Sequence, residues 1–221
     1  MLSEAAQDYM KQIYLLERRD GKASTSALAE AMGVSAASAT AMAKKLATLG
    51  LVDHSRYHGI TLTPPGEKVA LEVVRHHRLL EVYLTQTLGL SWDRVHSEAE
   101  RLEHVLSEEL EAEIDRVLGY PATDPHGDPI PTPELDLAAD RTTALAKLEH
   151  GQSATFARVS DSDPEMLRYL AERGIRPGAR LRVTGKQPFG GPLLVEVDDR
   201  EHALGGELAD KMRVEVEEEG R

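Results

Sequence analysis

Capping residues and glycines divide the first 66 residues into three short helices and a hairpin, and this division constrains the fold most. Apolar side chains at steps of three and four predict a first helix over residues 2–19. Asp20 and Gly21 end this helix, and Ser24 or Thr25 begins a second one. Gly33 ends the second helix and permits a tight connection to the next.

A third helix and two strands complete this part of the chain. Ser35 caps a helix that runs to Leu49, and Gly50 closes it. Residues 51–55 and 60–63 read as two strands of a hairpin. Three helices followed by a hairpin are typical of a winged helix-turn-helix, which favours DNA binding over a generic helical subdomain.

The net charge of −12 argues against a nucleic-acid binder when the chain is taken as a whole. Residues 1–66, however, hold seven basic and six acidic side chains, so their charge is near +1 and that of the remainder is near −13. The uneven distribution leaves DNA binding open for the first part of the chain alone.

Two absences exclude other classes of protein. The chain has no cysteine, which excludes disulfides, thiolate catalysis and cysteine-ligated zinc or iron–sulfur sites. No apolar stretch approaches the roughly 18 residues of a membrane span, and the first residues resemble no signal peptide. We therefore expect a cytoplasmic protein without a membrane partner.

Residues 67–118 are predicted to form two helices, joined near residues 89–92. Both helices carry broad apolar surfaces, including Val95, Leu102, Val105, Leu110 and Val117 on the second. So much apolar surface on two helices needs a further partner, and a second copy of the chain is the simplest one. A homodimer is therefore expected.

The last third of the chain is predicted to be rich in β-structure. A proline-rich connection over residues 119–133 precedes four short β-rich runs and one helix at 165–172, a pattern typical of a small β-barrel. The predicted architecture is α+β, with a winged helix-turn-helix over residues 1–66, a helical dimerisation domain over 67–140, and a barrel over 141–221.

The middle segment also carries histidines and glutamates at helical spacing. His77 and Glu81 stand four residues apart, and the second predicted helix would gather a further set on one face. This further set is His96, Glu100, Glu103 and His104. Imidazole and carboxylate donors on paired helices suit a divalent first-row metal. Two alternatives stay open. One is a metal-dependent enzyme, and the other is a helix-turn-helix regulator that senses an organic ligand and in which these side chains are only structural.

Several motifs together resemble the diphtheria toxin repressor and manganese transport regulator family. They are LTPPG at 62–66, RLLE at 78–81, VHSEAERLEH at 95–104 and HGDPIP at 126–131. The resemblance implies a metal-activated transcriptional repressor that binds operator DNA as a homodimer, controls metal-homeostasis genes and needs no organic cofactor. It also implies an SH3-like fold of the ferrous iron transport A type for residues 141–221.

The resemblance further implies two metal sites in each subunit. Asp8, Glu100, Glu103 and His104 would form the switching site. His77, Glu81 and His96 would form the other site, with Asp161, Asp163 and Glu165 as nearby candidates. The oxygen and nitrogen donors favour Mn(II), with Fe(II) as the second possibility. Lys11 departs from the family, because manganese-type members place a second carboxylate there.

The same resemblance assigns the DNA-reading residues. Small residues open the recognition helix, where they suit shape and methyl contacts, while basic and aromatic residues lie further along and in the hairpin. The set is Ser35, Ala37, Ser38, Thr40, Lys44, Arg56 and Tyr57. Simple solubility is the alternative role for Lys44.

Overall fold

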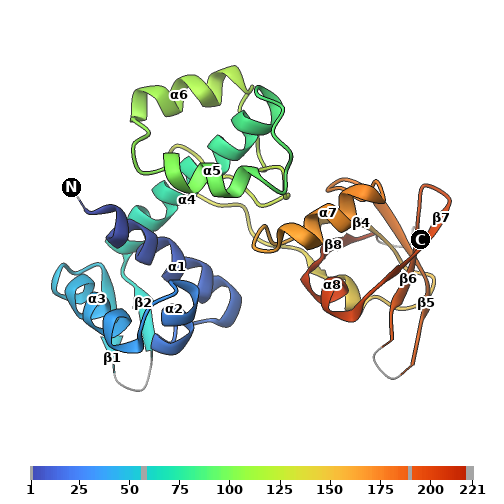
Figure 1. Cartoon of the computed structure of the whole chain (residues 1–221), viewed down its shortest axis with the longest axis horizontal. Helices are drawn as coiled ribbons and strands as arrows, with labels where there is room; N and C mark the ends of the chain where they lie inside the picture. The colour runs from blue at the N-terminus through green and yellow to red at the C-terminus, as the bar shows by residue number, and fades with distance from the viewer. Residues whose placement is uncertain (1, 56–58, 189–190, 218–221) are drawn as a thin grey trace. The chain divides into compact units, whose positions relative to one another are not determined.

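The computed structural model (Figure 1) describes residues 2–55, 59–188 and 191–217. The chain divides into two compact units. The first unit comprises Met1–His77, Glu100–Glu113 and Pro131–Leu137. The second comprises Arg78–Ala99, Ile114–Ile130 and Ala138–Arg221. Each unit draws on more than one of the three sequence ranges, so the domain boundaries stay a prediction.

Serine caps begin the three predicted helices of the first unit. These helices are α1 (Glu4–Asp20), α2 (Thr25–Ala31) and α3 (Ala36–Thr48). Ser3, Ser24 and Ser35 each accept a hydrogen bond from the backbone N–H three residues further on, which satisfies a donor that the helix leaves open. Gly21 ends α1 with a φ of 77°, a left-handed conformation that favours glycine.

The hairpin of β1 (Val52–Ser55) and β2 (Gly59–Leu62) follows α3, as the sequence predicts. The two strands are antiparallel, and their pairing runs from Val52 opposite Leu62 to Ser55 opposite Gly59. Fully buried side chains close the core between the helices and the hairpin, namely Met10, Ile13, Leu28, Leu46 and Ile60. Helix-turn-helix and wing are therefore present, although Arg56 and Tyr57 lie outside the described residues.

Three helices follow the hairpin, where the sequence predicted two. They are α4 (Pro64–Gln86), α5 (Val95–Leu102) and α6 (Glu108–Val117). Ser107 begins α6, because its Oγ accepts from the N–H of Leu110 at 3.3 Å, and acidic residues fill the first turn of this helix. The prediction of one continuous second helix is therefore wrong, and Glu103 and His104 lie in the turn between α5 and α6.

The apolar residues of these helices differ in exposure. Most of those on α4, such as Leu71, Val74 and Leu79, are buried within the chain. Exposed large apolar side chains gather instead on and around α5 and α6, namely Leu102, Val105, Leu110, Val117 and Tyr120. The surface left for a partner is therefore on α5 and α6 rather than on α4.

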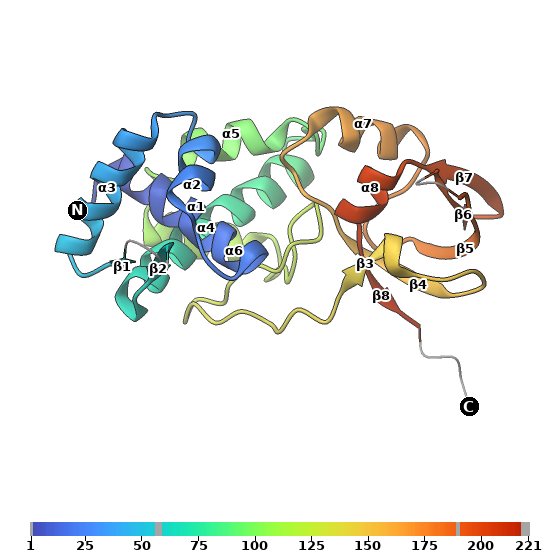
Figure 2. The same cartoon turned by 90° about the horizontal axis from the view of Figure 1, so that it is seen from below.

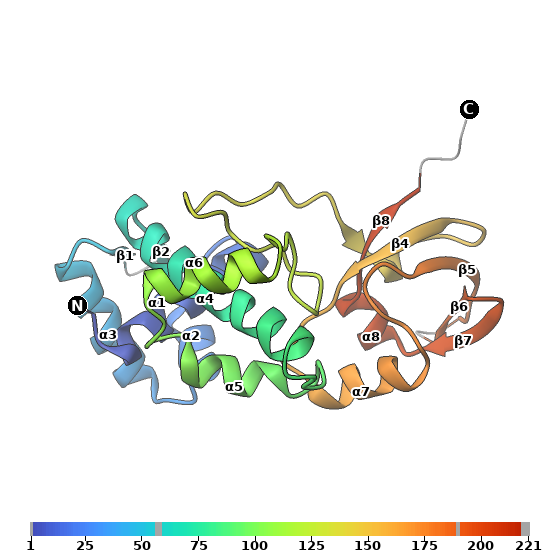
Figure 3. The ribbon, with the colours of Figure 1, turned by 90° about the horizontal axis from the view of Figure 1, so that it is seen from above.

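A six-stranded antiparallel sheet dominates the second unit. Its strands are β3 (Thr143–Ala144), β4 (Ser153–Arg158), β5 (Arg180–Lys186), β6 (Leu193–Val197), β7 (Arg200–Leu204) and β8 (Arg213–Val216). Their order is β3-β8-β4-β5-β6-β7. The last strand, β8, thus lies between β3 and β4, as Figure 2 and Figure 3 show from opposite sides.

Two helices and a short 3-10 turn lie between these strands along the chain. They are α7 (Pro164–Glu172), α8 (Gly206–Lys211) and η1 (Leu145–Lys147). Leu167 and Leu170 of α7 share a buried core with Phe156 and Leu181 of the sheet. The sequence predicted four of the strands and α7 but missed β3, β7 and α8. Among the described residues, no helix is long and apolar enough to cross a membrane.

Candidate metal centre

The buried carboxylate of Glu103 is the centre of a cluster in the first unit. Its side chain is fully buried, and its two oxygens contact groups from two different helices. Lys11 Nζ of α1 donates to Oε1 at 2.5 Å, and His77 Nδ1 of α4 lies 2.5 Å from Oε2. Because a carboxylate only accepts, Nδ1 of His77 carries the proton. The sequence placed His77 in the other set and did not anticipate this contact.

Lys11 also contacts Glu100, which lies in the last turn of α5. Its Nζ donates to Glu100 Oε1 at 2.7 Å, and Lys11 is only 3% exposed. Burial alone would lower the pKa of this ammonium, but the carboxylates of Glu103 and Glu100 outweigh burial and raise it. Lys11 is therefore a buried, charged partner of two predicted metal ligands.

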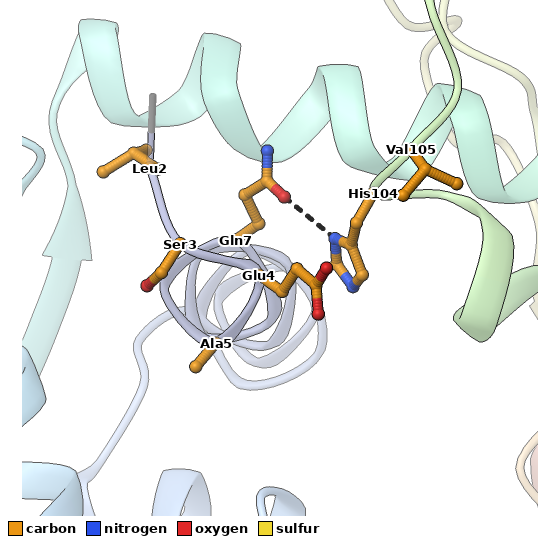
Figure 4. A pocket seen from close by; sticks show the side chains of 7 residues that line it. All are labelled: Leu2, Ser3, Glu4, Ala5, Gln7, His104 and Val105. Carbon is orange, nitrogen blue, oxygen red and sulfur yellow. Dashed lines mark hydrogen bonds between the residues drawn. The ribbon is translucent and has the colours of Figure 1, made fainter.

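Asp8 and His104 meet beside this cluster. His104 Nε2 lies 2.9 Å from Asp8 Oδ1 and 3.7 Å from Glu103 Oε1. Gln7 Oε1 accepts from His104 Nδ1 at 2.9 Å, and Figure 4 shows the two side chains pointing toward each other. Since this bond places the proton on Nδ1, Nε2 is the nitrogen that faces the acidic residues.

A surface hollow opens beside this histidine. Figure 4 shows the side chains that line it, which are Leu2, Ser3, Glu4, Ala5, Gln7, His104 and Val105. Burial raises the pKa of Asp8, while the neighbouring His104 acts in the opposite direction. Helix α1 and the turn after α5 thus bring the carboxylate of Asp8 and the imidazole of His104 together beside this hollow.

Contacts of His76, Arg75 and Glu111 hold the turn that carries Glu103. None of these three residues was predicted from the sequence to belong to the site. His76 Nδ1 lies 3.0 Å from the backbone oxygen of Glu103, and its Nε2 lies 2.7 Å from Glu111 Oε2. Arg75 contacts the same Glu111 and donates to the carbonyl of Pro131 at 2.6 Å. These contacts connect α4 with the turn, with α6 and with the segment that follows.

In the second unit, Glu81 is the corresponding buried carboxylate. His96 Nδ1 lies 3.6 Å from Glu81 Oε1 and 2.9 Å from Asp161 Oδ2. Burial would lower the pKa of His96, but the hydrogen bonds with Asp161 and Glu81 raise it to about 10. Asp161 is thus the partner from the last third of the chain, whereas Asp163 caps α7 through the N–H groups of Glu165 and Met166.

A second histidine contacts Glu81 from the other side. His126 Nδ1 lies 3.4 Å from Glu81 Oε2, and both side chains are fully buried. Burial would lower the pKa of His126, but Glu81 and Asp124 raise it to about 9. Burial, together with the charges of Glu81 and Asp128, raises the pKa of Asp124 well above its usual value. Arg78 also lies 3.7 Å from Asp124 Oδ2, so the buried acids of this group are balanced by cationic side chains when no metal is bound.

Backbone geometry holds this buried group in place. Asp124 Oδ1 accepts from the N–H of His126 at 2.8 Å and from that of Asp128 at 3.0 Å. Gly127 between them has a φ of 90°, and a Cβ there would lie 1.9 Å from the carbonyl oxygen of Ala157. The HGDPIP motif was noted in the sequence, but Asp124 and His126 were not predicted as site residues.

The donors in these groups fit a hard divalent ion. Ligand atoms of Asp8, Glu103 and His104 lie within 4.8 Å of one another, as do those of His77, Glu100 and Glu103. The same holds for Glu81, Asp124 and His126. The donors are carboxylate oxygens and imidazole nitrogens without sulfur, a set that suits manganese or iron.

The candidate DNA-reading side chains lie at the start of α3 and along it. Ser35, Ala37, Ser38 and Lys44 are exposed, and the hydroxyl of Thr40 donates to the carbonyl of Ala36 at 2.7 Å. Thr40 and Lys44 also line a surface hollow with four residues that were not predicted to contact DNA. These are Thr25, Ala47, Thr48 and His54.

Three known domain families match successive parts of the chain. Residues 1–60 match the N-terminal DNA binding domain of iron dependent repressors. Residues 63–132 match the metal binding and dimerisation domain of the same repressors, and residues 143–216 match the FeoA domain. The winged helix-turn-helix and the SH3-like domain predicted from the sequence are thereby confirmed.

Individual relatives extend over nearly the whole chain. The iron-dependent repressor IdeR of Mycobacterium leprae (strain TN) is 29% identical, covering 97% of this chain and 98% of the relative. The diphtheria toxin repressor of Corynebacterium efficiens is 30% identical over 95% of this chain and 97% of its own. A solved structure described as a manganese-dependent transcriptional repressor complex with manganese is 44% identical, with a TM-score of 0.90, covering 96% of this chain and 99% of its own.

These matches exclude the alternative of a metal-dependent enzyme, because the family consists of DNA-binding repressors. The chain belongs to the diphtheria toxin repressor and manganese transport regulator family, and it is a metal-dependent transcriptional repressor.

Proposed function

We propose that Mn(II) activates this repressor, with Fe(II) as the second candidate, and that it then binds operator DNA of metal-homeostasis genes as a homodimer. One observation carries the choice of metal. The donors around Glu103 and Glu81 are all oxygens and imidazole nitrogens, and the chain has no cysteine to supply a softer ligand. The manganese-bound relative with a TM-score of 0.90 supports the same choice.

Two metal sites in each subunit are part of the proposal. The first would be held by Asp8, Glu100, Glu103 and His104. The second would be held by Glu81 and His96, with His77 one helical turn before Glu81 on α4. Asp161 and the buried pair of Asp124 and His126 would complete the second set, since all three lie around Glu81 or His96.

The switch acts through α1. When bound, the divalent ion supplies positive charge and a fixed coordination geometry. Asp8 extends from α1, whereas Glu103 and His104 extend from the turn after α5, so joint engagement of these three residues fixes α1. Helix α3 shares its buried core with α1, and its orientation follows. Metal binding thereby becomes operator affinity without any change in the DNA-reading residues.

Repulsion between metal-free carboxylates would be another basis for such a switch, but these carboxylates are paired. Glu100 and Glu103 are bridged by Lys11, and Asp8 is paired with His104, so none of these carboxylates lacks a cationic or hydrogen-bonding neighbour. The switch therefore depends on how tightly Asp8 and His104 are held together when the ion is bound. It does not depend on relief of repulsion among three carboxylates.

Operator binding would use the exposed start of α3 and the wing. Ser35, Ala37, Ser38 and Thr40 would contact base edges and phosphates, and Lys44 would contact the backbone. Arg56 and Tyr57, which lie between β1 and β2 in the sequence, would contribute further contacts. The exposed apolar residues of α5 and α6 would form the dimer interface, so two α3 helices would read inverted half-sites.

The proposal is tested with duplexes selected from a random-sequence pool in the presence of Mn(II). Their affinity for the protein is measured by fluorescence anisotropy while Mn(II), Fe(II) under anaerobic conditions, or Mg(II) is titrated. We expect Mn(II), and next Fe(II), to raise the affinity at least tenfold over EDTA, whereas Mg(II) does not. Equal DNA affinity in EDTA and in saturating Mn(II) would reject the proposed switch.

A further inference from the structure

Two groups of ligand atoms in the first unit share one residue. Asp8, Glu103 and His104 form one group, and His77, Glu100 and Glu103 form the other. Within each group, the donor atoms all lie within 4.8 Å of one another. Because Glu103 belongs to both, the two groups describe adjacent cation positions that share a carboxylate.

Lys11 lies at the second of these positions. Its Nζ is 2.7 Å from Glu100 Oε1 and 2.5 Å from Glu103 Oε1, so it contacts both carboxylates of that group. Asp8 and Lys11 are three residues apart on α1 and therefore lie on one face of the helix. The same helix thus delivers a carboxylate to the first position and an ammonium to the second.

We propose that the ammonium of Lys11 is a tethered cation that permanently takes the second position, so that this cluster binds one divalent ion per subunit and not two. The inference rests on the proposed function, because it assumes that the first position takes a metal. It makes Lys11 the residue that determines the metal stoichiometry of the switching site.

Charge balance supports a single ion. Asp8, Glu100 and Glu103 together carry three negative charges at neutral pH. Lys11 cancels one of them, and one divalent ion neutralises the remaining two. Two divalent ions beside Lys11 would leave the buried site with an excess of positive charge, which is costly where water is excluded.

Burial separates this role from that of an ordinary surface ion pair. Lys11 is 3% exposed and the side chain of Glu103 is fully buried, so neither can exchange its partner for water. A lysine that a metal had to displace would need room to leave. Its Nζ would also abandon two short contacts in an environment where an unpaired ammonium is strongly disfavoured.

The test counts metal ions in two variants. Wild type, Lys11→Glu and Lys11→Met are dialysed against saturating Mn(II), and bound manganese is measured by elemental analysis. Lys68→Glu is the matched control, since Lys68 is exposed on α4 and the change alters net charge equally. We expect Lys11→Glu to bind one Mn(II) more per subunit than wild type, and Lys68→Glu to bind the wild-type number.

Electron paramagnetic resonance gives a second readout. Two Mn(II) ions bridged by the Glu103 carboxylate would be exchange-coupled, so we expect a coupled signal in Lys11→Glu and not in wild type. If Lys11→Glu does not fold, the count for Lys11→Met decides, because this neutral variant also vacates the second position. An unchanged manganese count in the folded variant would overturn the inference.

The same counts separate this inference from the proposed function. A wild-type protein that binds no Mn(II) at all contradicts the proposed function. A wild-type protein that binds Mn(II) in the same number as Lys11→Glu leaves the repressor mechanism in place and rejects only the role of Lys11.

Discussion

The Nε2–H of His126 donates to the carbonyl oxygen of Trp92 at 2.7 Å, and this bond determines which nitrogen faces Glu81. A carbonyl oxygen only accepts, so the proton must be on Nε2 and Nδ1 points toward the buried acid. Such a second hydrogen bond orients many metal-binding histidines. The same geometry makes the metal-free protein sensitive to pH.

Without metal, the free energy of unfolding is expected to fall as the pH rises above 7. The pKa of His96 is raised to about 10 and that of His126 to about 9, against 6.5 for an ordinary histidine. The two protonated histidines contribute fully to the free energy of unfolding below about pH 6.5. This contribution is lost as the pH rises through their raised pKa values. Urea unfolding in EDTA from pH 6 to 9.5 measures this slope.

The control for this pH dependence is His96→Gln, whose slope should be shallower over the same range. Saturating Mn(II) should also flatten the slope, because a ligating imidazole has already lost its proton. A metal-free stability that stays constant or increases between pH 7 and 9.5 would contradict the prediction.

Replacing Asp8 by Asn or His104 by Ala is expected to weaken the activation of DNA binding by Mn(II). Both residues connect α1 with the turn after α5, and changes even to supporting groups of metal sites typically cost about 10–100-fold in metal affinity. Anisotropy titrations should therefore need at least tenfold more Mn(II). Glu4→Gln is the control, because Glu4 is exposed and lines the surface hollow beside His104. This variant should behave like wild type. Wild-type activation of Asp8→Asn would show that α1 is not the switch.

The helices of the DNA-binding part could be predicted because local capping determines them. Ser24 and Ser35 cap α2 and α3, and Gly21 ends α1, so the signals lie within a few residues of each boundary. The break before α6 was missed although Ser107 offers the same signal, because the apolar periodicity continues through it. Strand β3 was missed because it has only two residues, which hold their place through long-range pairing with β8.

The candidate ligand residues were predicted from spacing and resemblance, and only the resemblance divided them into two groups. His96 and Glu100 are four residues apart on α5, yet His96 contacts Asp161 while Glu100 contacts Lys11. The role of Lys11 depends on the packing of α1, and no local pattern reveals it. Asp124 was missed because a single acidic residue in a proline-rich stretch is usually a solvated loop residue.

Substitutions in α3 and the wing should distinguish general contacts with DNA from sequence-specific contacts. Lys44→Ala and Arg56→Ala are expected to weaken binding to all duplexes alike and to reduce the slope of log affinity against log salt by about 1. Ser38→Ala should instead weaken the selected operator and leave random duplexes unchanged. Anisotropy at several salt concentrations measures both effects. If neither basic residue changes the affinity, α3 and the wing do not form the docking face.

Dimerisation should depend on the exposed apolar residues around α5 and α6. Val105 is 72% exposed, and Val105→Asp should lower the sedimentation coefficient at micromolar concentration to that of a monomer. Leu49→Asp is the control, because Leu49 is also exposed, at 52%, but lies at the end of α3. Wild-type protein that sediments as a monomer both with and without Mn(II) would contradict the prediction.

Gly127→Ala should disturb the buried group around Glu81. It should also lower the free energy of unfolding by more than the positive φ at this position alone would cost. At Gly127 a Cβ would lie 1.9 Å from the carbonyl oxygen of Ala157, so the strand or the loop must move. Gly151 has a similar φ of 87° but no atom within 4 Å of a Cβ, which makes Gly151→Ala the matched control. The control should lose about 1–3 kcal/mol of unfolding free energy, the typical cost of such a conformation.

Gly127→Ala adds the clash to this cost, and the displaced loop carries the backbone N–H groups that hold Asp124. We therefore expect a larger loss of stability and a smaller stabilisation by Mn(II) than in Gly151→Ala. Thermal melting with and without Mn(II) gives both quantities for each variant. Equal Mn(II)-induced shifts in the two variants would show that the loop of residues 124–128 does not support a metal site, because the clash alone would then account for the difference in stability.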